Sequence, residues 1–435
     1  MKKVFNIVFY NFFALLSFYA FGQQTPAQEQ TKPIAIIGAT AHIGNGEVIN
    51  NSLIIFEKGK LSLVADATTI KVDLTGKQVI EANGKHVYPG FILPNSTLGL
   101  VEIDAVRASD DDNEIGDFNP HIRSLIAYNA ESKVVESMRP NGVLIGQISP
   151  RGGRISGTST VVQFDAWNWE DAAIKVDDGI HLNWPNTFSR NWRSASPGIQ
   201  PNEGYNKNIQ ELQHFFNQAK AYLNGDKKIK NLPYEALSGI FDGSKTLFVH
   251  VNDEKGILDL IQFKTENKLE KLVIVGGYEA YKVSSLLKQH NIAVVLKRIH
   301  LRPEQDDEDT NLPYKLAKRL VDDGILVSLE ASGDNERMNS RNLPFYAGTT
   351  AAYGLSKEQA LQLITLNAAK ILGIDADYGS LETGKSATLF ISEGDALDMR
   401  TNKLLQAFID GREISLESHQ TELWKRYSQK YKDQE

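Results

Sequence analysis

The sequence contains no cysteine among its 435 residues. This absence excludes disulfides, cysteine metal ligands and a lipid-modified N-terminal cysteine. Basic residues are also in deficit, because 47 lysines and arginines face 54 acidic residues and the formal net charge is −7. Nucleic-acid-binding proteins present a basic face, so a nucleic-acid partner is not expected. The length suffices for one large barrel and a smaller domain.

Residues 1–22 have the features of a secretory signal peptide. Lys2 and Lys3 precede an apolar and aromatic run from Val4 to Phe21, and Ala20 and Gly22 are small residues before a plausible cleavage point. An uncleaved membrane anchor is the alternative, because the run approaches the length of a short spanning helix. Residues 23–32 are polar and predict a flexible mature N-terminus. The expected location is the periplasm or the cell exterior.

Two β-rich regions flank the middle of the chain. Residues 33–88 and 378–415 contain short apolar runs separated by turn residues, such as the turn at Glu57–Gly59, and show no helical period. They predict one composite β-sandwich domain that is split in sequence.

Residues 89–377 alternate strand-like and helix-like segments, which predicts a TIM-type (β/α)8 barrel of the α/β class. The expected strands are 91–98, 142–149, 158–165, 181–184, 247–251, 272–276, 292–296 and 325–331. The expected helices are 208–223, 255–265, 278–289, 313–323 and 357–372. Residues 416–435 predict a closing helix that buries Leu423, Trp424 and Tyr427.

Two phrases carry a resemblance to a known family. Pro89 to Leu93 reads Pro-Gly-Phe-Ile-Leu, and Gly379 to Ala387 reads Gly-Ser-Leu-Glu-Thr-Gly-Lys-Ser-Ala. Both resemble the metal-dependent amidohydrolase superfamily, and imidazolonepropionases in particular. In that superfamily the first barrel strand continues into two histidines one residue apart. Asn95 and Thr97 stand at those positions here.

The resemblance implies further metal ligands, and most of them are substituted. His250 matches the histidine of the fifth strand, whereas the sixth strand ends in Gly276. The aspartate of the eighth strand maps to Ala331, beside Glu330. The bridging lysine of the fourth strand has Lys175 as its nearest candidate.

These substitutions predict a degenerate metal site. Zinc lowers the pKa of bound water from 15.7 to about 7, a difference that corresponds to about 12 kcal/mol. Catalytic zinc usually needs three protein ligands, so His250 alone does not support an ordinary two-metal centre. One divalent ion in another arrangement stays open, with candidate ligands His250, Glu330, Asp334, Glu102 and Asp104. Otherwise His250 is a hydrogen-bonded structural histidine, and Glu330 is a carboxylate that is either solvated or paired with an arginine, with Arg337 and Arg341 as the near partners.

A glycine-rich loop after the second strand carries Arg151 and Arg154. Glycine lets backbone N–H groups approach an anion, and arginine binds carboxylate or phosphate through two parallel hydrogen bonds. The alternatives are an anion-recognition loop and a turn with a structural arginine.

Two functional classes follow. One is a hydrolase of non-peptide carbon–nitrogen bonds, with His250 and Glu330 as catalytic residues and Asn95, Thr97, Arg151 and Arg154 as substrate-binding residues. The other is a non-catalytic protein that binds a small molecule or serves as the partner of an intact amidohydrolase. The sequence does not identify the substrate or ligand, although small anions are among the candidates. It also leaves open the choice between a homo-oligomer and a hetero-oligomer with an intact paralogue.

Overall fold

The computed structural model describes residues 26–191, 198–333 and 335–432. The predicted signal peptide, residues 1–22, and Asp334 lie outside the described residues. The segment expected to be flexible, 23–32, is described from Pro26 onward, and there the Ala27 N–H donates to the Asp165 carboxylate at 2.9 Å. No helix within the described ranges is long and apolar enough to cross a membrane.

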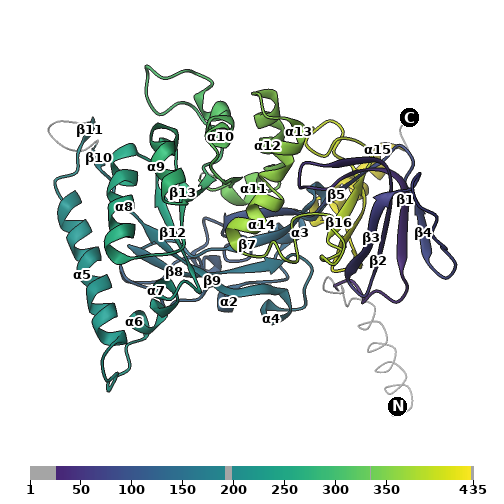
Figure 1. Ribbon diagram of the computed structural model, residues 1–435. Coiled ribbons are helices and arrows are strands. Elements are labelled where there is room, and N and C mark those ends of the chain that lie inside the picture. The colour runs from purple at the N-terminus through teal and green to yellow at the C-terminus, as the bar shows by residue number, and fades with distance from the viewer. Residues whose placement is uncertain (1–25, 192–197, 334, 433–435) are drawn as a thin grey trace, which may run out of the picture.

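Strands from both ends of the chain form one sheet at one end of the molecule (Figure 1). The two groups join where β5 pairs antiparallel with β16, with Pro89 opposite Leu389. The N-terminal strands are β1 (Ile34–His42), β2 (Val48–Glu57), β3 (Lys60–Asp66), β4 (Gln78–Glu81) and β5 (His86–Pro89). The C-terminal strands are β16 (Leu389–Ser392), β17 (Leu404–Ile409) and β18 (Arg412–Ile414).

This sheet curls around the core of the composite domain, so a single curled sheet encloses that core. The rings of Phe56 and Phe408, which come from opposite ends of the chain, meet edge to face at 5.1 Å between centroids. The expected turn joins β2 to β3, with positive φ at Lys58 (50°) and Gly59 (78°). Such turns match the twist of the strands that they connect.

A second eight-stranded sheet forms the barrel, in the order β15-β14-β13-β12-β9-β8-β7-β6. Each strand overlaps one of the eight expected segments. They are β6 (Phe91–Ser96), β7 (Val143–Ile148), β8 (Ile155–Gln163), β9 (Ala173–Asn183), β12 (Thr246–Val251), β13 (Leu272–Gly276), β14 (Ala293–Leu296) and β15 (Val327–Leu329).

One strand of the barrel differs in direction from the expected parallel arrangement. β8 is antiparallel to both β7 and β9. Only residues 149–154 separate β7 from β8, and a parallel crossover needs a dozen residues or more. The short glycine-rich loop therefore turns the chain back, and this reversal holds the loop at the barrel mouth.

The seam between β15 and β6 is bridged by residues 363–367. The Ile92 N–H donates to the Ile364 carbonyl at 2.8 Å, and the Ser328 hydroxyl donates to the Leu363 carbonyl at 2.7 Å. The predicted single helix 357–372 is therefore wrong in one respect, because it is interrupted into α13 (Lys357–Gln362) and α14 (Leu366–Leu372). Carbonyl groups at the interruption accept hydrogen bonds from the barrel strands instead of from N–H groups of the next helical turn.

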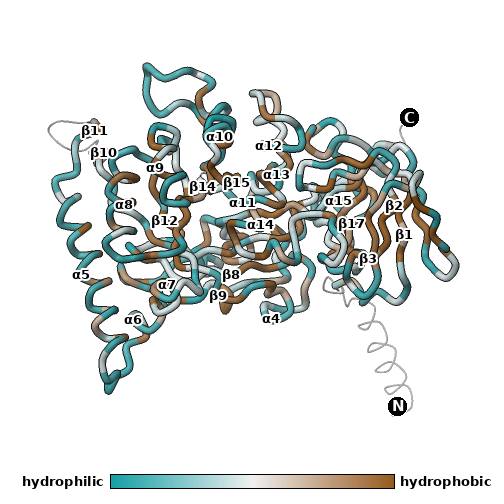
Figure 2. Tube along the Cα trace, viewed as in Figure 1, coloured by the Kyte–Doolittle hydropathy of each residue, from teal (hydrophilic) through white to brown (hydrophobic). Residues whose placement is uncertain are grey.

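The longer helices lie outside the barrel sheet. Figure 2 shows the strands of both sheets as mostly hydrophobic and α5 as mostly hydrophilic. The longer helices are α5 (Tyr205–Leu223), α8 (Glu254–Asn267), α9 (Ser284–Gln289), α10 (Leu312–Asp322) and α12 (Leu343–Ala352). Short helices are α2 (Ser124–Ala127), α3 (Lys133–Glu136), α4 (Trp169–Ala172), α6 (Leu232–Ala236), α7 (Ser238–Phe241) and α11 (Glu336–Ser340), and a hairpin consists of β10 (Phe188–Asn191) and β11 (Gly198–Pro201).

The C-terminal segment forms the expected helix, α15 (His419–Lys432). The predicted burial is wrong for two of its residues, since Trp424 is 69% exposed and Tyr427 is 58% exposed. The reason is that α15 is tied to the body at its start, where the His419 N–H donates to the Glu136 carboxylate at 2.7 Å.

Candidate functional site

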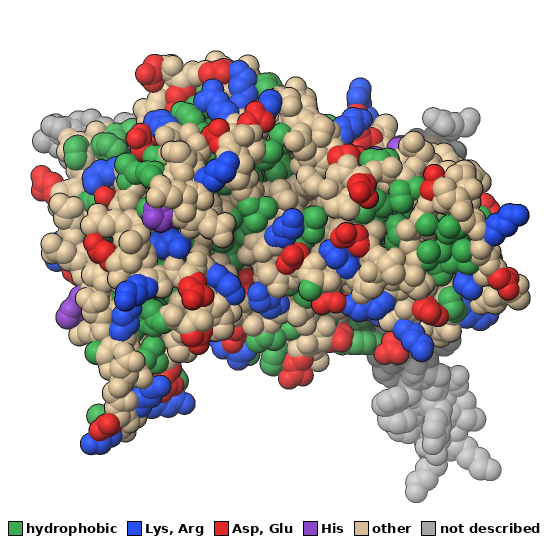
Figure 3. All heavy atoms as spheres, viewed as in Figure 1, with side chains coloured by type: hydrophobic (Ala, Val, Ile, Leu, Met, Phe, Trp, Pro, Cys, Tyr) green, Lys and Arg blue, Asp and Glu red, His purple; other side chains and the backbone are tan. Residues whose placement is uncertain are grey.

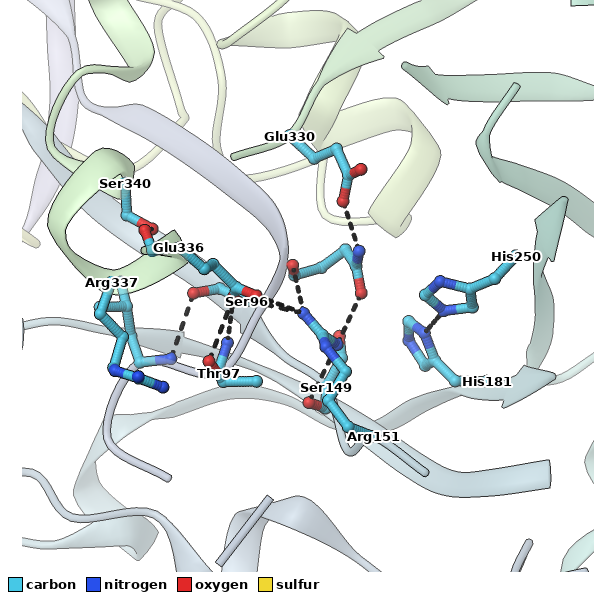
Figure 4. A network of polar contacts seen from close by, with 12 residues as sticks. Ser96, Thr97, Ser149, Arg151, His181, His250, Glu330, Glu336, Arg337 and Ser340 are labelled. Carbon is cyan, nitrogen blue, oxygen red and sulfur yellow. Dashed lines mark hydrogen bonds and ion pairs between the residues drawn. The ribbon is translucent and has the colours of Figure 1, made fainter. Parts of the chain in front are cut away.

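The candidate site lies at the barrel mouth, where the carboxyl ends of parallel strands meet. Asn95 lies near the end of β6 and Thr97 directly after it, His250 lies near the end of β12, and Glu330 follows β15. Arg151 reaches the same place from the loop between β7 and β8 (Figure 4). The structure thus brings together five of the six residues that the sequence suggested for the site.

Asn95 is the bridge of the site and is buried. Its side-chain amide donates to Glu330, and its side-chain oxygen accepts from Arg151 Nη1 at 2.8 Å. Its backbone φ is 52°, a left-handed conformation that asparagine tolerates better than most residues. An amide suits this place because it donates and accepts at once.

Arg151 joins Asn95 to a carboxylate that the sequence did not single out. Its Nη2 lies 3.1 Å from Glu336 Oε2 and also donates to the Asn95 carbonyl at 3.0 Å. Glu336 begins α11 and also accepts from the Thr97 N–H at 2.8 Å. The sequence feature that could have indicated Glu336 is its position six residues beyond Glu330, in the segment that follows the last barrel strand.

Glu330 is 2% exposed, and burial raises its pKa to about 7. Hydrogen bonds from Ser332 and Asn95 and the charge of Arg151 oppose this rise. The expected ion pair with Arg337 or Arg341 is wrong. Arg337 pairs with Asp104 instead, because α11 turns its side chain toward the loop after β6. Glu330 therefore exchanges a proton near neutral pH, which suits a general acid or base.

Two histidines face each other on the neighbouring strands β9 and β12. His181 Nδ1 and His250 Nε2 are 3.0 Å apart, so one ring nitrogen donates to the other. Burial lowers the pKa of His250 to about 3, with Arg151 adding to the effect, and lowers that of His181 well below 6.5. Both rings are neutral at physiological pH. The sequence did not mark His181 as a site residue. The signal that could have indicated it is its position on β9, on the same strand face as Asn183 two residues further on.

A second polar layer lies beneath the mouth. Gln147 accepts from the Asn95 N–H at 3.1 Å and donates to Asp178 at 2.7 Å. Ser159 also donates to Asp178 at 2.7 Å, and burial raises the pKa of this carboxyl to about 6. This layer supports the strand that carries Asn95, and no sequence motif marked it.

The remaining candidates lie apart from the network. Arg154 Nη1 donates to the Asn183 carbonyl at 3.1 Å, so it holds the end of β9. Lys175 donates to the Leu372 carbonyl at 2.8 Å at the opposite end of the barrel, because it lies at the start of β9. It does not reach the mouth.

The donor set at the mouth does not suit a divalent metal ion. Among residues 26–191, 198–333 and 335–432, no three histidine, cysteine, aspartate or glutamate side chains are grouped to hold one. His250 Nε2 is bonded to His181, Glu330 to Asn95, and Glu336 to Arg151. A guanidinium among these groups also repels a second cation at short range.

Comparisons with known proteins agree with this architecture. The model of the amidohydrolase family matches residues 235–415. The amidohydrolase of Thermotoga maritima MSB8 has a similar fold, with a TM-score of 0.76, 23% identity, and coverage of 88% of this chain and 99% of that one. Residues 235–415 are thus similar in sequence to the amidohydrolase family, and the chain shares the fold of the Thermotoga protein.

Matches to two superfamily relatives are partial. The imidazolonepropionase of Symbiobacterium thermophilum is 34% identical over 82 residues, which is 19% of each chain. The amidohydrolase tasK of Hapsidospora irregularis is 23% identical over 371 residues, 73% of this chain and 36% of that longer one. The matched region thus spans well under half the length of either relative.

The Arg151–Glu336 pair is expected to stabilise the fold measurably. Replacing Arg151 with methionine leaves the largely buried Glu336 carboxylate without its cation, which we expect to cost about 3–5 kcal/mol in the free energy of unfolding. Urea denaturation measures this cost. The double variant Arg151→Met/Glu336→Gln should recover part of the loss, and Arg154→Met is the matched control. Strictly additive effects of the two changes would show that the side chains are not coupled.

Glu330 should make stability depend on pH. Its folded-state pKa of about 7 lies above the ordinary value of 4.5, so the folded chain keeps a proton that the unfolded chain releases. The stability of the wild type relative to Glu330→Gln should therefore fall by about 3 kcal/mol between pH 4.5 and pH 7.5. Denaturation of both chains across this range tests it, and a constant difference would mean that the Glu330 pKa is ordinary.

Proposed function

We propose that this chain is a small-molecule-binding protein derived from a superfamily hydrolase, and that its barrel site uses the Arg151 cation in place of a bound metal ion. One observation carries the proposal. The Arg151 guanidinium binds Asn95 and lies within hydrogen-bond reach of Glu336, which in turn accepts from Thr97. Asn95 and Thr97 are the two positions where the resemblance expects metal-binding histidines.

Energetics favour binding over the superfamily's usual hydrolysis. An amide is attacked by hydroxide, and without a metal ion the site must supply about 12 kcal/mol of nucleophile activation by other means. General-base catalysis typically contributes 10²–10⁴-fold, or about 3–5 kcal/mol. The carboxylates and the arginine of this mouth therefore fall short of the metal's contribution, while they remain able to bind and orient a ligand.

The ligand we propose is a small anion. The Arg151 side chain is 23% accessible at the mouth, and that of Glu336 is 11% accessible. A carboxylate or phosphate on the ligand would compete with Glu336 for the guanidinium, whose fork geometry fits both groups. The neutral His250, half-buried beside it, offers a hydrogen-bonding group without a competing charge.

A second candidate function is metal-independent hydrolysis of a non-peptide carbon–nitrogen bond. The raised pKa of Glu330, about 7, favours it. Ionised Glu330 would take a proton from an attacking water, and Arg151 would stabilise the negative charge that develops on the carbonyl oxygen. The proton on Glu330 would then pass to the leaving nitrogen.

Location and partners belong to the same proposal. The N-terminal sequence supports export to the periplasm or exterior, and a chain with such a site could act beside an intact paralogue. Acidic and basic side chains are interspersed on the face seen in Figure 3, which offers no broad basic surface there for a nucleic acid.

Elemental analysis and calorimetry of the purified protein test the proposal. We expect far less than one metal ion per chain and saturable binding of small carboxylates or phosphates. Arg151→Gln should weaken this binding by about 10–100-fold, the value of a charge-assisted hydrogen bond. Arg154→Gln is the matched control and should bind like the wild type.

Two results would change the account. Turnover of a cyclic amide without added metal, abolished in Glu330→Gln, would favour the hydrolase. One tightly held metal ion per chain, lost in His250→Ala, would contradict both candidates.

A further inference from the structure

The C-terminal helix α15 presents an aromatic stripe to solvent. Trp424, Tyr427 and Tyr431 are 69%, 58% and 60% exposed, respectively. Their spacing of three and four residues places them on one face of the helix. Isolated exposed aromatic residues are ordinary, but three on one helix face form a surface that a partner normally covers.

Basic residues accompany this stripe. Residues 419–432 contain four lysines and arginines and one glutamate, within a chain whose net charge is −7. Arg426 lies over the ring of Tyr427 at 5.1 Å, and Lys430 lies over Tyr431 at 5.7 Å. The helix therefore combines aromatic rings and positive charge on its exposed surface.

The helix makes few contacts with the rest of the protein. Its start is fixed by the bond from the His419 N–H to Glu136 and by exchange of hydrogen bonds between Ser418 and Thr421. Beyond Leu423 nearly every described side chain is exposed. A helix of this length is marginal in water without tertiary packing, so a binding surface that covers the stripe would stabilise it.

We propose that α15 docks on an anionic phospholipid surface. Tryptophan and tyrosine favour the membrane–water interface, and lysine and arginine are attracted by anionic headgroups. Helices that dock in protein grooves use apolar anchors at the same spacings, but the cations beside the rings, Arg426 and Lys430, favour an anionic lipid surface over an apolar groove. The inference does not depend on the barrel site, because α15 lies at the end of the molecule that carries the composite sheet (Figure 1).

The absence of cysteine allows a local test in the full-length protein. Tyr427→Cys, labelled with the fluorophore NBD, reports on the aromatic face, and Gln429→Cys with the same label reports on the opposite face. In 0.1 M salt, phosphatidylglycerol-containing vesicles should brighten the label and shift its emission to the blue at 427, and much less at 429. The effect should vanish in 1 M salt, where the Debye length is about 3 Å.

Two further variants connect the signal to the proposed residues. Lys430→Gln in the Tyr427→Cys chain should lower the vesicle affinity about fivefold, the value of one cation near an anionic surface. Trp424→Ala/Tyr431→Ala in the same chain should abolish the spectral shift.

Three outcomes would overturn the proposal. They are an unchanged spectrum at 427, an equal change with neutral phosphatidylcholine vesicles, and a change produced by raising the protein concentration alone. The last would mean that α15 pairs with a second copy. Because the label is on α15, insertion of the apolar N-terminal sequence into a vesicle does not by itself produce the expected difference between 427 and 429.

Discussion

Arg151 donates to Asn95 on one side and pairs with Glu336 on the other, and this contact joins three segments that are far apart in the sequence. One is the first barrel strand, another is the loop between β7 and β8, and the third is the short helix after β15. A buried carboxylate such as Glu336 needs a compensating cation. The guanidinium supplies it beside Asn95 and Thr97, the two positions where the resemblance expects metal-binding histidines, so the charge of Glu336 is compensated by a protein group.

The protonation states around this cation follow from its position and from burial. Burial makes the His181–His250 pair neutral and brings the Glu330 pKa close to 7. The Asn95 amide connects Glu330 to Arg151 and, through its backbone, to the polar layer at Gln147. A change at Arg151 therefore reaches both the acid–base group and the strand that positions it.

The architecture could be predicted from the sequence because apolar runs and turn residues act locally. All eight barrel strands and the joining of the two chain ends follow from such patterns. The direction of β8 did not, since a period-two pattern does not encode strand direction. The break at residues 363–365 was hidden for a similar reason, because the hydrogen bonds at this break come from β6 and β15.

The site was only partly predictable. Asn95, Thr97, His250 and Glu330 were found because strand ends and a family resemblance marked them, and Arg151 because of its glycine-rich loop. Their partners were not found. Glu336 pairs with Arg151, and His181 with His250, through tertiary geometry that no local pattern contains. For the same reason Arg154 was grouped with Arg151, although it holds the end of β9.

The central claim is that a protein cation takes the place of the metal at the barrel mouth. Crystals grown with excess zinc and measured at the zinc absorption edge test it most directly. We expect no anomalous peak within coordination distance of Asn95, Thr97, His250 or Glu330, and we expect Arg151 still to be bound to Asn95. A fully occupied peak among these residues, with Arg151 displaced, would contradict it.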